Sequence, residues 1–459
     1  MARPVSGAKP VARPGWRHGA FAGWGRVARA EMDAARPERL NDLAHALRAA
    51  DRRGVIVYAG GRSYGDAALN GGGQAILTRR LDRLLDFDPA SGVVVAEAGV
   101  SFDDLRRVLL PRGFLSPVTP GTAFATLGGA VANDVHGKNQ DHAGNFGRHL
   151  AWLELMLPSG EIRRLMPEDR LFKATLGGLG LTGIVVAVAL RMMRVPSRFV
   201  ALQERRVRDL DEFLEALEEV RRTAAYSVGW IDALAQGRHL GRGIVESADP
   251  AQPEAGDRYR EAKARSLPID LPGLALNPLG IGLFNALYWR RVPPRGRARR
   301  LAYDRFLYPL DALAGWNRLY GRRGFHQFQC LLPEATSRQA LRSLLETCVG
   351  SRAASFLGVL KTMGQDGTGL LSFGGRGHTL ALDFPARPGI DDLLIRLERV
   401  VLDHGGRIYL AKDARMSAAG FAAMYPRLPE YRAILAEVDP DGRMMSDLAR
   451  RLDIRGGGP

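Results

Sequence analysis

At 459 residues, with 46% apolar and 25% charged side chains, the chain is long enough for two or three globular domains. Two cysteines, Cys330 and Cys348, give neither a disulfide framework nor a metal-ligand cluster, so no metal is predicted and a reducing compartment is the simplest fit. The net charge of +16 favours an anionic partner, such as a phosphate-bearing substrate, an acidic membrane surface or nucleic acid.

The first part of the chain is predicted to be an irregular arm followed by alternating strands and helices. Residues 1 to about 20 are rich in Pro, Arg and Ala, which is typical of a disordered segment or a surface arm. Ser101 is a suitable N-cap for the second helix, with two aspartates in its first turn. Helices are expected at 41–50 and 102–110, and strands at 55–58, 75–78 and 93–96.

Two glycine-rich stretches follow strands in this region. The first is Gly60-Gly61-Arg62-Ser63-Tyr64-Gly65, and the second runs from Thr119-Pro120-Gly121-Thr122 through Gly128-Gly129 to His136-Gly137-Lys138-Asn139. Glycine lacks a Cβ, so consecutive backbone N–H groups can form a nest for a pyrophosphate. Their spacing does not fit the G-x-G-x-x-G fingerprint of a Rossmann fold. One such cluster is also typical of a surface turn, but two favour a phosphate-bearing cofactor.

The middle of the chain changes pattern near Val195-Pro196. Before this point we expect a hairpin of 152–157 and 162–165, a helix at 167–176 and a strand that begins at 181. After it, a strand–helix–strand order occurs twice, which predicts an antiparallel sheet with helices on one face. Its elements are expected at 199–206, 209–223, 225–232, 326–332, 337–347, 355–361, 379–384 and 389–402.

An apolar stretch followed by arginines interrupts this pattern. Residues 268–289 contain Asp270 as their only charge, and six arginines without an acid follow up to residue 300. This combination suits peripheral contact with an acidic membrane surface, and a mobile surface loop is an equally good interpretation. No run of about 18 apolar residues predicts a span, and no apolar core follows the basic N-terminal residues as in a secretory signal. We therefore expect a cytoplasmic protein, with possible contact at the inner face of the membrane.

Three motifs support a resemblance to a known family. Residues 61–66, 134–139 and 409–415 resemble those of the vanillyl-alcohol-oxidase family, which has the PCMH-type FAD fold, and within it the decaprenylphosphoryl-ribose oxidases. The likeness runs from 23–26 to 446–452. It implies an α+β fold of two domains: an FAD-binding domain at 1–195, an antiparallel-sheet substrate (cap) domain at 196–405, and a segment at 406–459, with three helices, that returns to the FAD domain.

The resemblance implies that FAD is the cofactor. Tyr64 occupies the place where many relatives carry a covalently attached histidine, so we predict that the FAD is bound non-covalently. The residues expected to bind the cofactor are Gly60, Gly61, Arg62, Ser63, Tyr64, Gly65, Thr119, Pro120, Gly121, Thr122, Gly128, Gly129, Ala132, Asn133, His136, Gly137, Asn139, Gly144, Phe146, Gly183, Ile184 and Lys412.

The same resemblance assigns candidate catalytic and substrate residues. Lys412 matches the catalytic lysine of the family, and a lysine there can stabilise negative charge on reduced flavin or, if desolvated, act as a base. His136 and Tyr64 are further catalytic candidates, and a structural hydrogen bond is the alternative role for His136. The expected substrate residues are Trp230, Gln327, Gln329 and Lys361, together with Thr379 and Ala381, where the family has an asparagine and a cysteine; Leu307 replaces a tyrosine of the family's pocket.

By resemblance, the reaction is oxidation of the 2′-hydroxyl of a polyprenyl-phosphoryl-β-D-ribose to the 2′-keto sugar. A partner keto-reductase would complete epimerisation to arabinose, and oxygen or a quinone would take the electrons. The alternative within the same fold is oxidation of a soluble alditol or sugar-1,4-lactone. A non-enzymatic nucleic-acid binder would fit the charge, but the sequence contains no recognised nucleic-acid module, so no nucleic-acid partner is predicted. An arginine-rich proteome explains the same charge without any partner.

Overall fold

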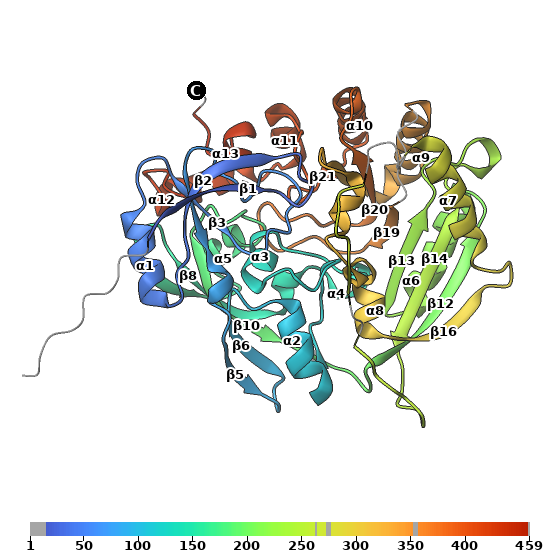
Figure 1. Cartoon of the computed structure of the whole chain (residues 1–459), viewed down its shortest axis with the longest axis horizontal. Helices are drawn as coiled ribbons and strands as arrows, with labels where there is room; N and C mark the ends of the chain where they lie inside the picture. The colour runs from blue at the N-terminus through green and yellow to red at the C-terminus, as the bar shows by residue number, and fades with distance from the viewer. Residues whose placement is uncertain (1–14, 262–263, 272–276, 352–356, 458–459) are drawn as a thin grey trace, which may run out of the picture.

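The computed structural model describes residues 15–261, 264–271, 277–351 and 357–457. Two sheet-containing parts lie side by side in Figure 1, and helices of the C-terminal segment cover the first of them. The first part contains a four-stranded and a five-stranded sheet, and the second is built on an eight-stranded sheet. The arrangement is a mixed α+β fold, as predicted.

The four-stranded sheet has the order β1-β2-β4-β3. Strand β1 pairs antiparallel with β2, whereas β2, β4 and β3 are parallel to one another. The expectation of an arm up to residue 20 is therefore wrong for residues 17–20, which belong to β1; residues 1–14 lie outside the described part. The bounds are β1 Arg17–Ala22, β2 Arg29–Ala35, β3 Val55–Tyr58 and β4 Gln74–Leu77, with helix α1 at Leu40–Ala49.

The five-stranded sheet is antiparallel in the order β5-β6-β10-β8-β9. Its central strand β10 is a continuous apolar run whose side chains are buried on both faces, as expected for a strand with neighbours on both sides. Ser101 caps α2 and forms a reciprocal capping box with Asp104, as the sequence predicted. The bounds are β5 Leu84–Asp88, β6 Val93–Glu97, β8 Leu150–Met156, β9 Ile162–Leu165 and β10 Ile184–Arg191, with α2 Phe102–Leu109, α3 Leu127–Ala132, α4 Gln140–Ala143 and α5 Arg170–Thr175. The short strands β7 Phe114–Leu115 and β11 Met193–Arg194 pair with each other.

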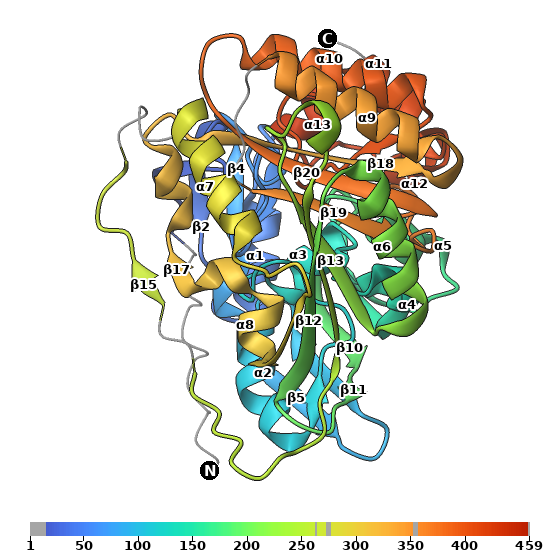
Figure 2. The same cartoon turned by 90° about the vertical axis from the view of Figure 1, so that its right-hand side faces the viewer.

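The eight-stranded sheet is antiparallel in the order β16-β12-β14-β13-β19-β20-β18-β21. Helices α6, α9 and α10 pack on it through a large apolar core, and Figure 2 shows them on the same side of the sheet. The bounds are β12 Phe199–Val207, α6 Leu210–Thr223, β13 Tyr226–Ile231, β14 Gly243–Pro250, β18 Phe325–Pro333, α9 Glu334–Gly350, β19 Gly358–Met363, β20 Gly377–Pro385 and α10 Ile390–Asp403.

The apolar and basic stretch at 268–300, for which a mobile surface loop was one of two interpretations, contains regular structure. Its described residues form helix α7 at Pro278–Arg290 and strand β16 at Arg297–Ala302, which pairs with β12 at the edge of the sheet. The sequence did not indicate β16, because five of its six residues are Arg or Ala. Short elements follow or flank it: β15 Arg265–Ser266, α8 Tyr303–Leu307 and β17 Leu313–Ala314.

The C-terminal segment connects the two parts. Strand β21, Arg407–Ile408, still pairs with β18 in the eight-stranded sheet. The chain then crosses to the first part, where Met444 forms a bridge with Val55. Helices α11 Ala418–Met424, α12 Leu428–Val438 and α13 Asp447–Arg451 belong to this segment. None of the helices in the described part of the chain is long and apolar enough to cross a membrane.

Candidate active site

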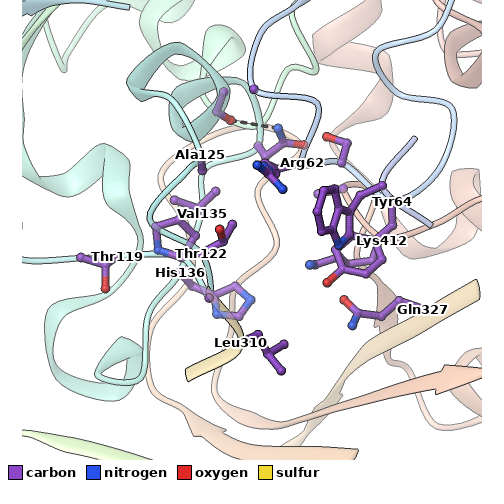
Figure 3. Close-up of a pocket in the computed structure, with 18 of the residues that line it drawn as sticks. Arg62, Tyr64, Thr119, Thr122, Ala125, Val135, His136, Leu310, Gln327 and Lys412 are labelled. Atoms are coloured by element: carbon purple, nitrogen blue, oxygen red, sulfur yellow. Dashed lines mark hydrogen bonds between the residues drawn. The ribbon is translucent and has the colours of Figure 1, made fainter. Parts of the chain in front are cut away.

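A cavity of ≈ 570 Å³ lies where the two glycine-rich stretches face the eight-stranded sheet (Figure 3). The loop after β3 and the segments around α3 form one wall. Side chains from β13, β18, β19 and β20 form another, and Lys412 from the loop after β21 reaches the space between them. Predicted residues that line the cavity are Gly60, Gly61, Arg62, Ser63, Tyr64, Gly65, Thr119, Pro120, Gly121, Thr122, Gly128, Gly129, Ala132, Asn133, His136, Gly137, Gly183, Trp230, Leu307, Gln327, Gln329, Lys361, Ala381 and Lys412.

The first glycine loop is packed tightly against the segment that carries Lys412. A Cβ on Gly65 would lie 1.8 Å from the backbone oxygen of Asp413, so only glycine fits at this position. The Tyr64 amide donates a hydrogen bond of 2.9 Å to the Ala411 oxygen. Arg451 joins both segments, because its guanidinium binds the carboxylates of Asp66 at 2.8 Å and Asp413 at 2.9 Å.

The second glycine loop is shaped by a buried aspartate. Asp134 has a positive φ of 38°, which is uncommon for a residue with a side chain. Its carboxylate accepts hydrogen bonds from the Gly147 amide at 2.9 Å and from the Ser372 hydroxyl at 2.5 Å. Burial raises the pKa of Asp134, although these bonds oppose the shift. The aspartate thus fixes the loop in the conformation that turns His136 toward the cavity.

Two buried polar atoms on the cavity wall point to a polar ligand. Neither the Nε of Arg62 nor the Oδ1 of Asn133 has a hydrogen-bond partner within the described ranges. The Arg62 guanidinium lies 4.2 Å from the centre of the Trp24 ring and 5.2 Å from that of Phe124. Burial lowers the pKa of this arginine. A buried polar group without a partner is costly, so an anionic or hydrogen-bonding ligand would be stabilised here.

Lys412 and Tyr64 are in direct contact. The Nζ of Lys412 lies 3.6 Å from the centre of the Tyr64 ring, in cation–π geometry. Burial and the charge of Lys361 lower the pKa of Lys412, and Asp383 opposes this shift. Tyr64 is itself buried within an aromatic cluster that includes Phe325, and burial raises its pKa well above the usual value. The cavity therefore contains a lysine whose neutral form is accessible near neutral pH.

Asp383 is a functional candidate that the sequence did not reveal. Its carboxylate accepts a hydrogen bond of 2.5 Å from the Gln327 amide and one of 3.2 Å from the Tyr320 hydroxyl. Burial raises the pKa of Asp383, and the Lys412 ammonium counteracts the shift. One sequence feature could have indicated this role: Asp383 lies between Leu382 and Phe384 in β20, and it is fully buried in the structure. A carboxylate inside an apolar strand needs polar partners.

His136 connects two of the predicted substrate residues. Its Nδ1 lies 3.1 Å from the Nζ of Lys361, and its Nε2 lies 3.1 Å from the side-chain amide of Gln329. Burial lowers the pKa of His136 well below the usual value, and the charges of Lys361 and Lys412 act in the same direction. Burial also lowers the pKa of Lys361 to about 7. The imidazole is therefore neutral, and the Gln329 amide nitrogen, which can only donate, faces its Nε2.

Five predicted residues do not line the cavity. Phe146 packs in the core against Phe102, and Ile184 belongs to a separate core beneath the four-stranded sheet. Asn139 donates to the Pro117 oxygen at 2.8 Å, so it supports the loop from behind. Gly144 has a positive φ of 69° at the end of α4. Thr379 lies behind Gln329, whose amide is 3.2 Å from its hydroxyl.

The cavity also contains residues that sequence reasoning did not assign to the site. Lys138 belongs to the second glycine-rich stretch but was given no role, and it donates a hydrogen bond of 2.5 Å to the Phe306 oxygen. Tyr288 and Arg291 come from the end of α7 and just beyond it, in the apolar and basic stretch for which only membrane contact or a surface loop was considered. Their position depends on the packing of α7 against the sheet, and no local sequence motif predicts this packing. Other such residues are Trp24, Tyr58, Leu310, Trp316, Leu357, Val359 and Tyr409.

The arrangement suits oxidation of an alcohol by a bound cofactor. The glycine loops and Arg62 offer backbone N–H groups and a positive charge for phosphates. On the facing wall, Gln327 and Gln329 provide amide groups that can bind hydroxyls, and Lys412 lines the same cavity as a group that can accept or hold a proton.

Comparison with known proteins identifies the cofactor class. A family model for the FAD binding domain matches residues 34–166, which include both glycine-rich stretches and end directly after β9. The buried, unpartnered polar atoms of Arg62 and Asn133 fit the polar groups of such a cofactor. The cofactor of this chain is therefore FAD.

Three relatives extend the likeness over the chain. Decaprenylphosphoryl-β-D-ribose oxidase of Mycolicibacterium smegmatis is 36% identical over 450 residues, which cover 94% of this chain and 97% of that protein. An uncharacterised protein of Streptomyces coelicolor is also 36% identical, over 77% of this chain and 100% of its own length. An alditol oxidase of a Streptomyces species is 25% identical over 93% of this chain and 97% of its own. This chain therefore belongs to the decaprenylphosphoryl-β-D-ribose oxidase family of FAD-binding oxidoreductases.

Proposed function

We propose that this protein oxidises the 2′-hydroxyl of a polyprenyl-phosphoryl-β-D-ribose to the 2′-keto sugar. The observation that carries the proposal is the convergence of Lys412, Gln327 and Gln329 on one cavity in a chain that is 36% identical to a decaprenylphosphoryl-β-D-ribose oxidase along nearly its whole length. A separate keto-reductase would use the product, since a 2′-keto sugar is the form from which reduction can give the arabinose epimer.

The residues of the glycine loops, with Arg62 and Asn133, would hold the FAD. When bound, FAD accepts a hydride from the carbon that carries the hydroxyl group. The protein binds and orients the sugar and gives the hydroxyl proton a destination. Side chains on the wall opposite the loops are suited to these tasks.

Lys412 is the group to which we assign the proton. A buried lysine with a lowered pKa is partly neutral near pH 7, so its Nζ can accept a proton from a hydroxyl. The resulting ammonium remains beside the Tyr64 ring at 3.6 Å, which stabilises the positive charge. The neighbouring Asp383 stabilises the same charge by Coulomb attraction.

The two glutamines orient the sugar. Gln327 and Gln329 alternate on β18 and therefore extend to the same face of the sheet. Asp383 holds the amide of Gln327, and His136 contacts that of Gln329. These contacts restrict the side chains before substrate arrives, which lowers the entropic cost of binding.

The decisive experiment compares substrates under anaerobic conditions. Purified, FAD-loaded protein is mixed with a polyprenyl-phosphoryl ribose, and the visible absorbance of oxidised flavin is followed. We expect bleaching with the phosphoryl ribose and none with alditols or sugar-1,4-lactones at the same concentration. Bleaching by an alditol alone would favour the second candidate, which the full-length similarity to an alditol oxidase supports. Ala381 and Leu307 line the cavity, so replacing them with the family's cysteine and tyrosine would show whether these two positions affect the choice between the substrate classes.

A further inference from the structure

Helix α7 exposes a continuous apolar stripe. Leu279, Leu283 and Leu287 follow one another at intervals of four residues and are 87%, 64% and 60% exposed, and Phe284 beside them is 46% exposed. Residues four apart in a helix share one face. The helix lies at the periphery of the molecule in both views (Figures 1 and 2). A water-exposed row of large apolar side chains on one helix marks an interaction surface.

The opposite face of α7 is firmly attached to the protein. Ile281 and Asn285 are buried, and the Asn285 amide donates a hydrogen bond of 2.7 Å to Asp232. The Trp289 indole donates to the Val207 oxygen at 2.9 Å. The Tyr288 ring packs on Trp230, with ring centres 4.8 Å apart. The exposed stripe is therefore presented by a helix with a fixed inner face.

The charges near the stripe are positive. Between residues 271 and 303 the sequence contains no Asp or Glu. Glu204 of β12 binds three of the arginines of this stretch, Arg291, Arg297 and Arg299, at 2.7, 2.8 and 2.9 Å. Arg290 and Arg295, by contrast, are exposed at the C-terminal end of the helix and in the turn after it. An apolar stripe flanked by exposed arginines complements an anionic lipid surface.

The same helix reaches the active site. Tyr288, in its last turn, and Arg291, directly after it, line the cavity that contains Lys412 and Trp230. One turn before Tyr288, Phe284 stacks on its ring with centres 5.7 Å apart and is partly exposed. The helix therefore connects the outer surface with the substrate end of the cavity over about one turn.

We propose that α7 is an interfacial helix that docks on an anionic bilayer and presents the cavity to substrate held in that bilayer. The exposed leucines enter the interfacial region, and Arg290 and Arg295 contact the lipid phosphates. This inference rests on the proposed function for the identity of the substrate, but the docking itself does not depend on catalysis.

The test is flotation of the full-length, FAD-loaded protein with vesicles of phosphatidylcholine and phosphatidylglycerol. We expect the double variant Leu283→Gln/Leu287→Gln to lose roughly a hundredfold in vesicle partitioning, since each leucine contributes its transfer energy. Ile395→Gln is the matched control, because Ile395 is 55% exposed on α10, away from the stripe. It should partition as the unmodified protein does. Arg290→Gln/Arg295→Gln should bind several-fold more weakly and lose most of the salt dependence.

Activity separates this inference from the proposed function. The double leucine variant should oxidise a short-chain, water-soluble phosphoryl ribose at the unmodified rate and a vesicle-embedded one more slowly. If no phosphoryl ribose is oxidised but the leucine variant still loses vesicle binding, the docking surface stands and the proposed substrate fails. Undiminished vesicle binding by the leucine variant would overturn the inference. So would a second outcome, in which the unmodified protein does not bind vesicles and forms a dimer that the leucine variant does not form, because the stripe would then be a contact between two copies of the chain.

Discussion

The ammonium nitrogen of Lys412 lies 3.6 Å from the centre of the Tyr64 ring, although the two residues come from opposite ends of the chain. The contact follows from the close packing of Gly65 on Asp413, which leaves room for no side chain. It places a lysine with a lowered pKa beside the glycine loop that would hold the cofactor. The catalytic role proposed for Lys412 therefore depends on how the first loop and the C-terminal segment are joined.

Replacing Lys412 should impair the reductive step and spare the cofactor. In Lys412→Met we expect the rate of anaerobic flavin reduction to fall by about 100–1000-fold, because the hydroxyl proton loses its acceptor. The backbone bond between Tyr64 and Ala411 does not involve the side chain, so FAD content should persist. Stopped-flow absorbance measures the rate. Lys173→Met on α5 is the control, and a Lys412→Met rate equal to that of the control would remove Lys412 from the mechanism.

Asp383 should tune the pH at which Lys412 works. Its negative charge raises the pKa of Lys412, so Asp383→Asn should lower that pKa further. If neutral Lys412 is the base, the acid limb of the pH profile should move to lower pH by about one unit. The profile of flavin reduction between pH 5 and pH 9 provides the measurement. A shift toward higher pH would contradict the assignment of the base.

The sequence predicted the local parts of this site and missed the contacts between distant ones. The glycine loops and the lysine motif are short segments whose chemistry is visible in order, so most of the residues assigned from them line the cavity. The contacts between Asp383 and Gln327 and between His136 and Lys361 join different strands and loops, so no local sequence pattern predicts them. Phe146 was misplaced because a motif gives the position of a segment and not the direction of each side chain.

In the fold, too, elements with a clear local pattern were predicted, whereas an element that depends on a neighbouring strand was missed. Strands and helices with clear periodicity were found within a few residues of their bounds, as for α6 and β18. Strand β16 was missed because its arginines had the pattern of a solvated run. In the structure the carboxylate of Glu204, from the neighbouring β12, compensates their charge. That pairing is a property of the sheet and could not be read from the run itself.

Lys361 should make stability depend on pH. Burial lowers its pKa from 10.5 to about 7, so between these values the unfolded chain binds a proton that the folded chain does not. The free energy of unfolding should therefore rise with pH across this window. Below pH 7, the destabilisation caused by burying Lys361 should be at its maximum and should no longer change with pH. Relative to Lys361→Met, the free energy of unfolding of the unmodified protein should increase by about 2 kcal/mol from pH 7 to pH 10, a value that allows for water in the cavity.

Denaturant unfolding of FAD-loaded Lys361→Met and of the unmodified protein at several pH values measures this difference. The comparison between the two proteins removes contributions from other titrating groups that they share. Lys173→Met again serves as the control, since its side chain lies outside the cavity. A stability difference that is constant with pH would show that Lys361 is charged in the folded state throughout.

The FAD should leave the protein on acid precipitation. Tyr64 lies on the cavity wall in the loop where relatives with covalent flavin have a histidine, and its ring is held between Lys412 and Phe325. A phenol in this position gives no histidyl linkage to the flavin. After precipitation and centrifugation, the yellow colour and its fluorescence should be in the supernatant. Flavin that stays with the pellet would mean that another side chain forms a covalent bond.

Gly65→Ala should separate the two segments on which the site depends. The new Cβ would lie 1.8 Å from the Asp413 oxygen, and backbone atoms on both sides must move to relieve the overlap. We expect a loss of about 3 kcal/mol in unfolding free energy, together with weaker FAD binding. Gly71→Ala is the matched control in the same connection, because its nearest neighbours would be side-chain oxygens at 3.5 Å. Flavin fluorescence on titration with FAD and denaturant unfolding measure the two effects. If Gly65→Ala retained both its FAD affinity and its stability, the first loop and the Lys412 segment would not be held as one unit, and the Lys412–Tyr64 contact would not explain the site.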